Sequence, residues 1–151
     1  MKKFELTAES KINIFRKKLF RIKALISFGD VEEGETGGWI EKEENLEQSS
    51  GDAWVYGNAE VYGNARVSGN AEVSGNADYT TIHGFGTQFR TTTFFQCEDK
   101  QIRVSCGCFL GTIPEFREQV KNTREGKIAE EYLMIADLME KHFVKEKESG
   151  E

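Results

Sequence analysis

The chain has 151 residues, a net charge of −6 and an apolar content of 38%, which predicts one compact unit or two very small ones. The acidic balance disfavours generic nucleic-acid binding, and direct sequence-specific recognition is not expected. No apolar run reaches the roughly 20 residues of a membrane span, and the first residues lack the apolar segment of a signal peptide. Three cysteines in such a chain predict free thiols in a reducing compartment.

Charged residues are unevenly distributed over the first third of the chain. Lys11 to Lys23 is basic, whereas Asp30 to Glu47 is acidic. Blocks of charge usually form solvated faces, so these two are expected to pair with each other or with a neighbouring subunit. The alternative is an acidic surface, including Glu41, Glu43 and Glu44, that binds a basic partner.

The N-terminal part, residues 1–50, is predicted to be a β element with an acidic cap. Residues 4–7 and 19–24 predict strands, although the apolar spacing of the second segment also fits a helix. The glycine-rich residues 34–40 predict a turn that leads into the next part of the chain.

The clearest pattern is a six-residue repeat over Trp54 to Asp78. Four units repeat Val-x-Gly-Asn-Ala-x without a slip, with valines at positions 55, 61, 67 and 73. The valines are expected to point inward, and Gly-Asn favours the positive φ that a sharp corner requires. Ile40 and Leu46 are also six residues apart, which suggests an irregular earlier unit.

This pattern resembles the hexapeptide repeat of left-handed parallel β-helices. The resemblance implies that three units make one turn, so that Val55 stacks on Val73. We therefore expect a mixed, mainly β fold, in which a short left-handed parallel β-helix over residues 51–80 is flanked by the N-terminal β element and a C-terminal β-hairpin plus two α-helices. Four units make little more than one turn and cannot bury their own ends, so a homo-oligomer, most simply a trimer, is predicted.

The third part, residues 81–151, begins with a predicted hairpin and continues into two helices. Residues 91–97 and 102–106 form the hairpin, in a register that sets Cys97 opposite Ile102 and Cys106 opposite Thr93. A capping box at residues 112–115 opens the first helix, and residues 124–126 break it. A second helix with an apolar stripe is predicted from about residue 127 to 145, followed by a frayed tail.

The whole chain also resembles a group of bacteriophage proteins to which no activity is assigned. The segments that carry the resemblance are residues 19–24, 37–46, 54–59 and 103–109 with Gly111 and Thr112. It implies a phage or prophage origin and expression in the cytoplasm of a bacterial host, but no particular activity. Because small phage proteins often inhibit host defence, a role against host defence is a hypothesis by analogy of context.

An acyltransferase is the obvious enzyme hypothesis, because many hexapeptide-repeat proteins transfer acyl groups with a histidine base. The candidate bases are His83 and His142. A coil of this length lacks the long groove that acyl-CoA needs, so no catalytic residue is expected. Three cysteines and His83 do not supply the usual ligand pairs for zinc, and neither a metal nor a cofactor is expected.

The remaining function classes are a binding protein and a structural oligomerisation module. Tyr56 and Tyr62 lie outside the valine register and are expected to bind a partner or to pack between subunits. Weaker candidates to bind a small ligand follow the repeat or surround the start of the first helix: His83, Phe85, Arg103, Gly107 and Thr112. The leading hypothesis is a non-enzymatic, oligomeric binding protein of phage origin. It would inhibit a CRISPR or other defence protein, or sequester a small signalling nucleotide.

Overall fold

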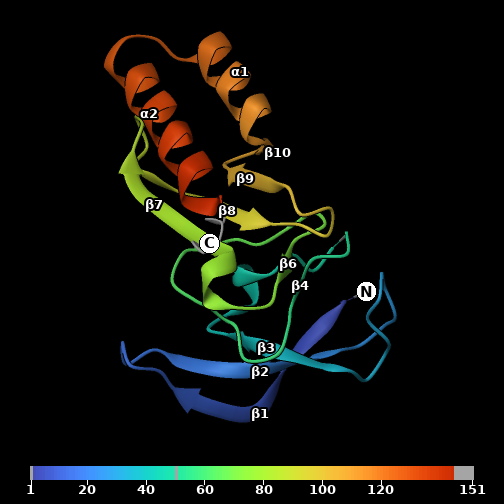
Figure 1. Ribbon diagram of the computed structural model, residues 1–151. Helices are drawn as coiled ribbons and strands as arrows, with labels where there is room; N and C mark the ends of the chain where they lie inside the picture. Colours follow the sequence, from blue (N-terminus) through green and yellow to red (C-terminus); the bar gives the residue numbers. More distant parts are fainter. Residues whose placement is uncertain (1, 50, 145–151) are drawn as a thin grey trace, which may run out of the picture.

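The computed structural model describes residues 2–49 and 51–144. These described residues form short and long strands, two α-helices and two single turns of 3-10 helix (Figure 1). The strands are β1 Phe4–Ile12, β2 Lys18–Ala24, β3 Thr36–Ile40, β4 Trp54–Val55, β5 Glu60–Val61, β6 Glu72–Val73, β7 Tyr79–Phe85, β8 Arg90–Gln96, β9 Ile102–Cys106 and β10 Phe109–Thr112. The helices are η1 Glu43–Asn45, η2 Asn76–Asp78, α1 Ile113–Thr123 and α2 Gly126–Phe143.

The strands form two four-stranded sheets and one short pair. The first sheet has the order β1-β2-β3-β5, the second has the order β10-β9-β8-β7, and β4 pairs with β6. Figure 1 shows the long strands of the first sheet at one end, the helices at the other, and the repeat between them. Neither helix in the described part of the chain is long and apolar enough to cross a membrane.

The predicted left-handed parallel β-helix is wrong. The fold is mixed α/β, and its sheets are mostly antiparallel, including every pairing within the second sheet. Within the described residues, parallel pairing is confined to β3 with β5, β4 with β6 and a single bridge between Leu46 and Val67. The physical reason is that each repeat unit extends for two residues at most before it turns, and the first three units turn at a glycine with positive φ, at Gly57, Gly63 or Gly69. Longer neighbouring strands then supply antiparallel ladders that the repeat cannot build.

The repeat nevertheless predicts which side chains are buried. The valines at positions 55, 61, 67 and 73 are each at most 1% exposed. Val55 pairs with Val73, while Ile40 pairs with Val61. The six-residue spacing of apolar residues therefore encodes an inward face, although it does not encode a β-helix.

The first hydrophobic core joins the repeat to the N-terminal sheet around Trp54. The indole is fully buried, and its ring centroid lies 5.3 Å from that of Phe28 and 6.3 Å from that of Phe4. Gly37 is required beside it, since a Cβ at this position would lie 2.7 Å from the Trp54 ring and 2.6 Å from the Val55 carbonyl oxygen. Close approach of β3 to the repeat thus depends on the absence of a side chain.

The second core lies between the helices and the second sheet. Phe116 of α1 packs edge-on against Phe94 and Tyr132, at centroid distances of 6.1 and 5.8 Å. The predicted capping box is confirmed: the Glu115 amide donates to Thr112 Oγ1, and the Thr112 amide donates to the Glu115 carboxylate. The predicted hairpin and both helices are present, whereas the predicted tail at residues 146–151 lies outside the described residues.

The predicted register of the hairpin is wrong by one residue. Ile102 faces Gln96, and Cys106 faces Thr92. The cysteines therefore do not share one buried face: Cys97 is buried, Cys106 is half-buried and Cys108 is exposed.

Strand β8 connects the two cores. Neighbouring side chains alternate between the faces of a strand, so Phe95 belongs to the first core and Phe94 to the second. The predicted division at residues 50 and 80 stays a prediction, because the first core draws residues from all three predicted parts.

Candidate ligand-binding site

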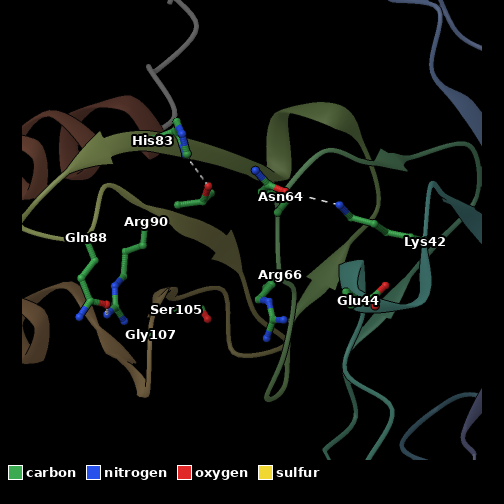
Figure 2. A pocket seen from close by; sticks show the side chains of 11 residues that line it. Lys42, Glu44, Asn64, Arg66, His83, Gln88, Arg90, Ser105 and Gly107 are labelled. Carbon is green, nitrogen blue, oxygen red and sulfur yellow. Dashed lines mark hydrogen bonds between the residues drawn. The ribbon is translucent and has the colours of Figure 1, made fainter.

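A cleft of about 530 Å³ opens between the repeat and the strands β7 and β8. Figure 2 shows its side chains arranged around the open space, and they come from segments far apart in the sequence. We call it the cationic cleft. Its polar side chains belong to Lys42, Glu44, Asn64, Arg66, His83, Gln88, Arg90, Thr91 and Ser105.

The charge of this cleft is opposite to that of the protein. The chain carries a net charge of −6, but the described residues that line the cleft include three cations, Lys42, Arg66 and Arg90, and one carboxylate, Glu44. Cations gathered in a concave site raise the local concentration of anions. The cleft is therefore suited to an anionic ligand.

Arg90 is positioned by a glycine that leaves space for its side chain. A Cβ at Gly107 would lie 1.8 Å from Arg90 Nη1, and the φ of Gly107 is +59°. Arg90 Nη2 also donates a hydrogen bond to Gln88 Oε1 across the β7–β8 turn. The guanidinium is thus held against the β9–β10 turn, where part of it faces the cleft.

The other polar groups are supported by short contacts. His83 Nδ1 lies 2.8 Å from Thr91 Oγ1, its partner across the β7–β8 ladder. The Arg66 amide donates to Thr93 Oγ1 at 3.0 Å, which fixes the repeat against β8. The Arg66 guanidinium itself forms no ion pair within the described part of the chain.

A second compartment, of about 490 Å³, continues from the cationic cleft. The two compartments share Glu44, Arg66, Ser105 and Gly107. The additional lining differs in chemistry, since it contains carboxylates and apolar side chains: Glu43, Leu46, Glu47, Val67, Phe109 and Leu110. We call it the acidic compartment, and the two together the groove.

The carboxylates of the acidic compartment differ in how far they are already paired. Glu43 binds Lys2 Nζ at 2.9 Å. The hydroxyl and amide of Ser49 both donate to Glu47 Oε2, and these hydrogen bonds hold the pKa of Glu47 below its usual value. Glu44 is exposed and has no hydrogen bond or ion pair to another described residue. Glu44 and one oxygen of Glu47 are thus available to a ligand.

The groove brings together several residues that the sequence predicts as binding residues. His83 and Gly107 line the cationic cleft, Glu44 lines both compartments, and Glu43 lines the acidic one. Glu41 lies outside it, because its Oε1 accepts a hydrogen bond from the Gly63 amide at 2.8 Å.

Three other predicted ligand-binding residues do not line the groove. Arg103 forms a bidentate pair with Asp99, at 2.9 and 3.0 Å, which lowers the pKa of that carboxyl. Thr112 caps α1, and Phe85 packs against the second core. These positions therefore do not support the predicted role of the three residues in ligand binding.

The two tyrosines predicted to bind a partner are partly covered by the chain itself. Tyr56 packs against the first core, and burial together with nearby carboxylates raises its pKa to about 12. The Tyr62 ring lies 6.2 Å from that of Phe15 in the β1–β2 turn. Partner binding through either ring stays a prediction.

The main cations of the cleft were missed from the sequence because they converge only in the fold. Lys42 immediately precedes η1, Arg66 lies in the repeat, and Arg90 is the first residue of β8. One signal was present at Arg66, since the equivalent position of both neighbouring units is a glutamate, Glu60 or Glu72. A reversal of charge in a regular repeat marks a position that the repeat itself does not explain.

Comparisons with protein-family models and with curated proteins find no match for this chain. Among the described residues, no group of three or more His, Cys, Asp or Glu side chains could hold a metal ion. The shape and chemistry of the groove are therefore the features that bear on function.

Proposed function

We propose that this chain is a non-enzymatic binding protein that holds a small phosphate-bearing molecule in the cationic cleft. The observation that supports the proposal most is the gathering of Lys42, Arg66 and Arg90 around one cleft in a protein with a net charge of −6. A volume of about 530 Å³ is within the usual range for small-molecule sites.

The cations have complementary roles in this proposal. A guanidinium donates two parallel hydrogen bonds to phosphate oxygens, so Arg66 and Arg90 fix the orientation of the phosphate. Lys42 adds a point charge on a flexible stem; among the described residues, its Nζ is held by a 3.4 Å hydrogen bond to Asn64 Oδ1 alone. The hydroxyls of Thr91 and Ser105 and the imidazole of His83 complete the lining.

The resemblance to bacteriophage proteins gives this proposal its setting. In the cytoplasm of a bacterial host, a protein that sequesters a signalling nucleotide would weaken a defence response that depends on the nucleotide. Such a role needs affinity and abundance rather than turnover. A trimer would supply several grooves per particle, but the proposal holds for one chain as well.

Isothermal titration calorimetry with pyrophosphate and a panel of nucleotides tests this proposal. We expect binding that weakens with added salt and that falls at least tenfold in Arg66→Ala and in Arg90→Ala. Arg117→Ala is the matched control, because Arg117 is on α1, away from the groove, and pairs with Asp137 and Glu140. Melting temperatures of all variants would establish that they remain folded.

Two results would overturn the proposal. Absence of binding to every phosphate compound at millimolar concentration would remove the cleft as an anion site, as would affinity unchanged in both cleft variants. Acetyl-CoA belongs in the panel for a different reason. Acyl transfer that His83→Ala abolishes would show that the protein is an enzyme.

A further inference from the structure

We infer that the ligand is a ribonucleotide, whose phosphate lies in the cationic cleft and whose base lies in the acidic compartment, and that guanine is preferred. This inference rests on the proposed function of the cleft. It is carried by three features of the groove: the continuity of its compartments, the change in their chemistry, and an unpaired carboxylate at their boundary.

Continuity allows one molecule to occupy both compartments. They share Arg66 from the repeat, Ser105 and Gly107 from the β9–β10 segment, and Glu44 from η1. Each has a volume near 500 Å³, at about 530 and 490 Å³. A ligand held by its phosphate in the first therefore has an open path into the second.

The acidic compartment offers an apolar surface to a planar base. Leu110 is 46% exposed, although it is a large aliphatic residue. It lies close to the repeat, since a Cβ at Gly69 would be 3.2 Å from Leu110 Cδ2. The neighbouring Phe109 borders the compartment but directs its ring toward Phe116 of the second core. An aromatic base placed against Leu110 would remove apolar surface from water.

The position of Glu44 fits a ribose. A carboxylate repels a phosphate, so its presence in a cationic cleft is unexpected unless another part of the ligand uses it. Glu44 lines both compartments and has no hydrogen bond or ion pair to another described residue. The ribose lies between the phosphate and the base in a nucleotide, and carboxylates accept hydrogen bonds from ribose hydroxyls.

Glu47 distinguishes guanine from adenine and cytosine. Its Oε2 accepts from Ser49, whereas no described residue donates to its Oε1. An ionised carboxylate can only accept hydrogen bonds, and guanine presents two adjacent donors, N1–H and the N2 amino group. Adenine presents an acceptor at N1, and cytosine presents one at N3, so both would oppose a carboxylate. The arrangement therefore favours guanine.

The experiment compares affinities for GMP, IMP, AMP, CMP and dGMP, measured by calorimetry on the full chain. We expect GMP to bind at least tenfold more tightly than AMP or CMP. IMP, which lacks the amino group at position 2, should bind with intermediate affinity. In Glu47→Gln, the affinities for GMP and AMP should differ by no more than about threefold. In Glu44→Gln, the affinities for GMP and dGMP should become equal.

Controls separate this inference from the proposed function. Glu33→Gln removes an exposed carboxylate outside the groove and should change neither ratio. Equal affinity of the wild type for GMP and AMP, with binding still dependent on Arg66, would overturn the inference and leave the proposed function standing. No binding of any nucleotide or of pyrophosphate would overturn both. The affinities of the wild type for GMP, IMP and AMP test the preference for guanine even if Glu47→Gln unfolds the protein.

Discussion

The two hydrophobic cores are made of different kinds of side chains. The core of the repeat contains small side chains that recur every six residues, such as Val61 and Ala65, beside a few aromatic rings centred on Trp54. The second core consists of larger side chains on the helices and the antiparallel sheet, with Phe116 among other aromatic rings. The periodic half of the sequence predicted burial and the pairing of Val55 with Val73, but not the β3–β5 pair or the antiparallel sheets. The aperiodic half predicted its elements from local signals.

Strand β8 couples these cores and also borders the groove. Phe94 and Phe95 point into different cores, while Arg90 and Thr91 at the start of the strand line the cationic cleft. The groove therefore lies where the repeat meets the second sheet. Variants in each core can establish whether the two halves unfold together.

The largest expected effects come from truncating the central aromatic ring of each core. Trp54 is 0% exposed and Phe116 is 3% exposed. Removal of a buried aromatic side chain costs about 3–5 kcal/mol, and we expect Trp54→Ala and Phe116→Ala each to lower the free energy of unfolding by that amount. Because β8 contributes to both cores, either change should lower the stability of the whole chain.

Two spectroscopic probes can follow the cores separately. Both tryptophans, Trp39 and Trp54, lie in the N-terminal half, while α1 and α2 pack in the second core. In Phe116→Ala, urea denaturation followed by tryptophan fluorescence and by circular dichroism at 222 nm should give one shared midpoint. Two separated midpoints would mean that the cores unfold independently.

The next largest effect is expected at Asn45, a buried polar side chain that connects η1 to the repeat. Its Oδ1 accepts from the amides of Glu41 and Lys42, and its Nδ2 donates to the carbonyls of Gly63 and Ala65. Asn45→Ala leaves these backbone groups without that partner, at a cost of about 2–3 kcal/mol.

A matched variant tests the cause of the Asn45 effect. Asn45→Asp keeps the size and the two acceptor contacts but places a carboxylate against two carbonyl oxygens, so it should be no more stable than Asn45→Ala. Guanidinium denaturation provides the comparison. A loss below about 0.5 kcal/mol in Asn45→Ala would be typical of an exposed surface position. It would contradict the expected stabilisation by this hydrogen-bond network.

These residues show how far the sequence could predict the fold. Apolar residues spaced by six gave the inward face of the repeat, and a Thr-x-x-Glu box gave the start of α1, because both signals are local. Strand pairing in the repeat was not local: the parallel partner of Val61 is Ile40, which lies before an irregular insertion. Two-residue strands carry too few side chains to specify which neighbours they join.

The groove was still harder to predict than the fold. The sequence pointed to His83 and Gly107 as weak ligand-binding candidates and to Glu44 as part of the acidic block, and these residues do line it. Arg90 becomes a cleft residue only because β8 pairs with β9 and the β9–β10 turn carries Gly107. No repeat or residue spacing in the sequence indicates that Arg90 and Gly107 lie next to each other.

A smaller, pH-dependent effect is expected at Lys3 in the first core. Its Nζ is buried and donates to the Ala53 carbonyl at 2.9 Å, and burial lowers the pKa of Lys3 to about 8. Between pH 8 and the unfolded value of about 10.4, the unfolded chain retains a proton that the native chain has lost. Stability should therefore rise with pH across this range, by at most about 1.4 kcal/mol per pH unit.

The comparison with Lys3→Met isolates this contribution. Below pH 8 both states of the wild type are protonated at Lys3, so the difference in stability from the variant should be constant. From pH 8 to 9.5 the wild type should gain relative to Lys3→Met, and the range ends before tyrosines of the unfolded chain titrate near pH 10. Parallel stability curves for the two proteins would contradict the assigned pKa.

The smallest effect is expected at Arg117, whose ion pairs join α1 to α2 on the surface of the second core. Its guanidinium lies 2.8 Å from Asp137 Oδ1 and 3.0 Å from Glu140 Oε1, but the side chains of these carboxylates are 72% and 55% exposed. Exposed pairs contribute about 0–1 kcal/mol because water and salt screen them. Arg117→Ala should thus lower the free energy of unfolding by less than about 1 kcal/mol, with most of the loss absent at 1 M NaCl. A loss above 2 kcal/mol that persists in salt would mean that the second core depends on packing of the arginine stem. In that case a polar side chain at the surface, and not only apolar packing, would support the second core.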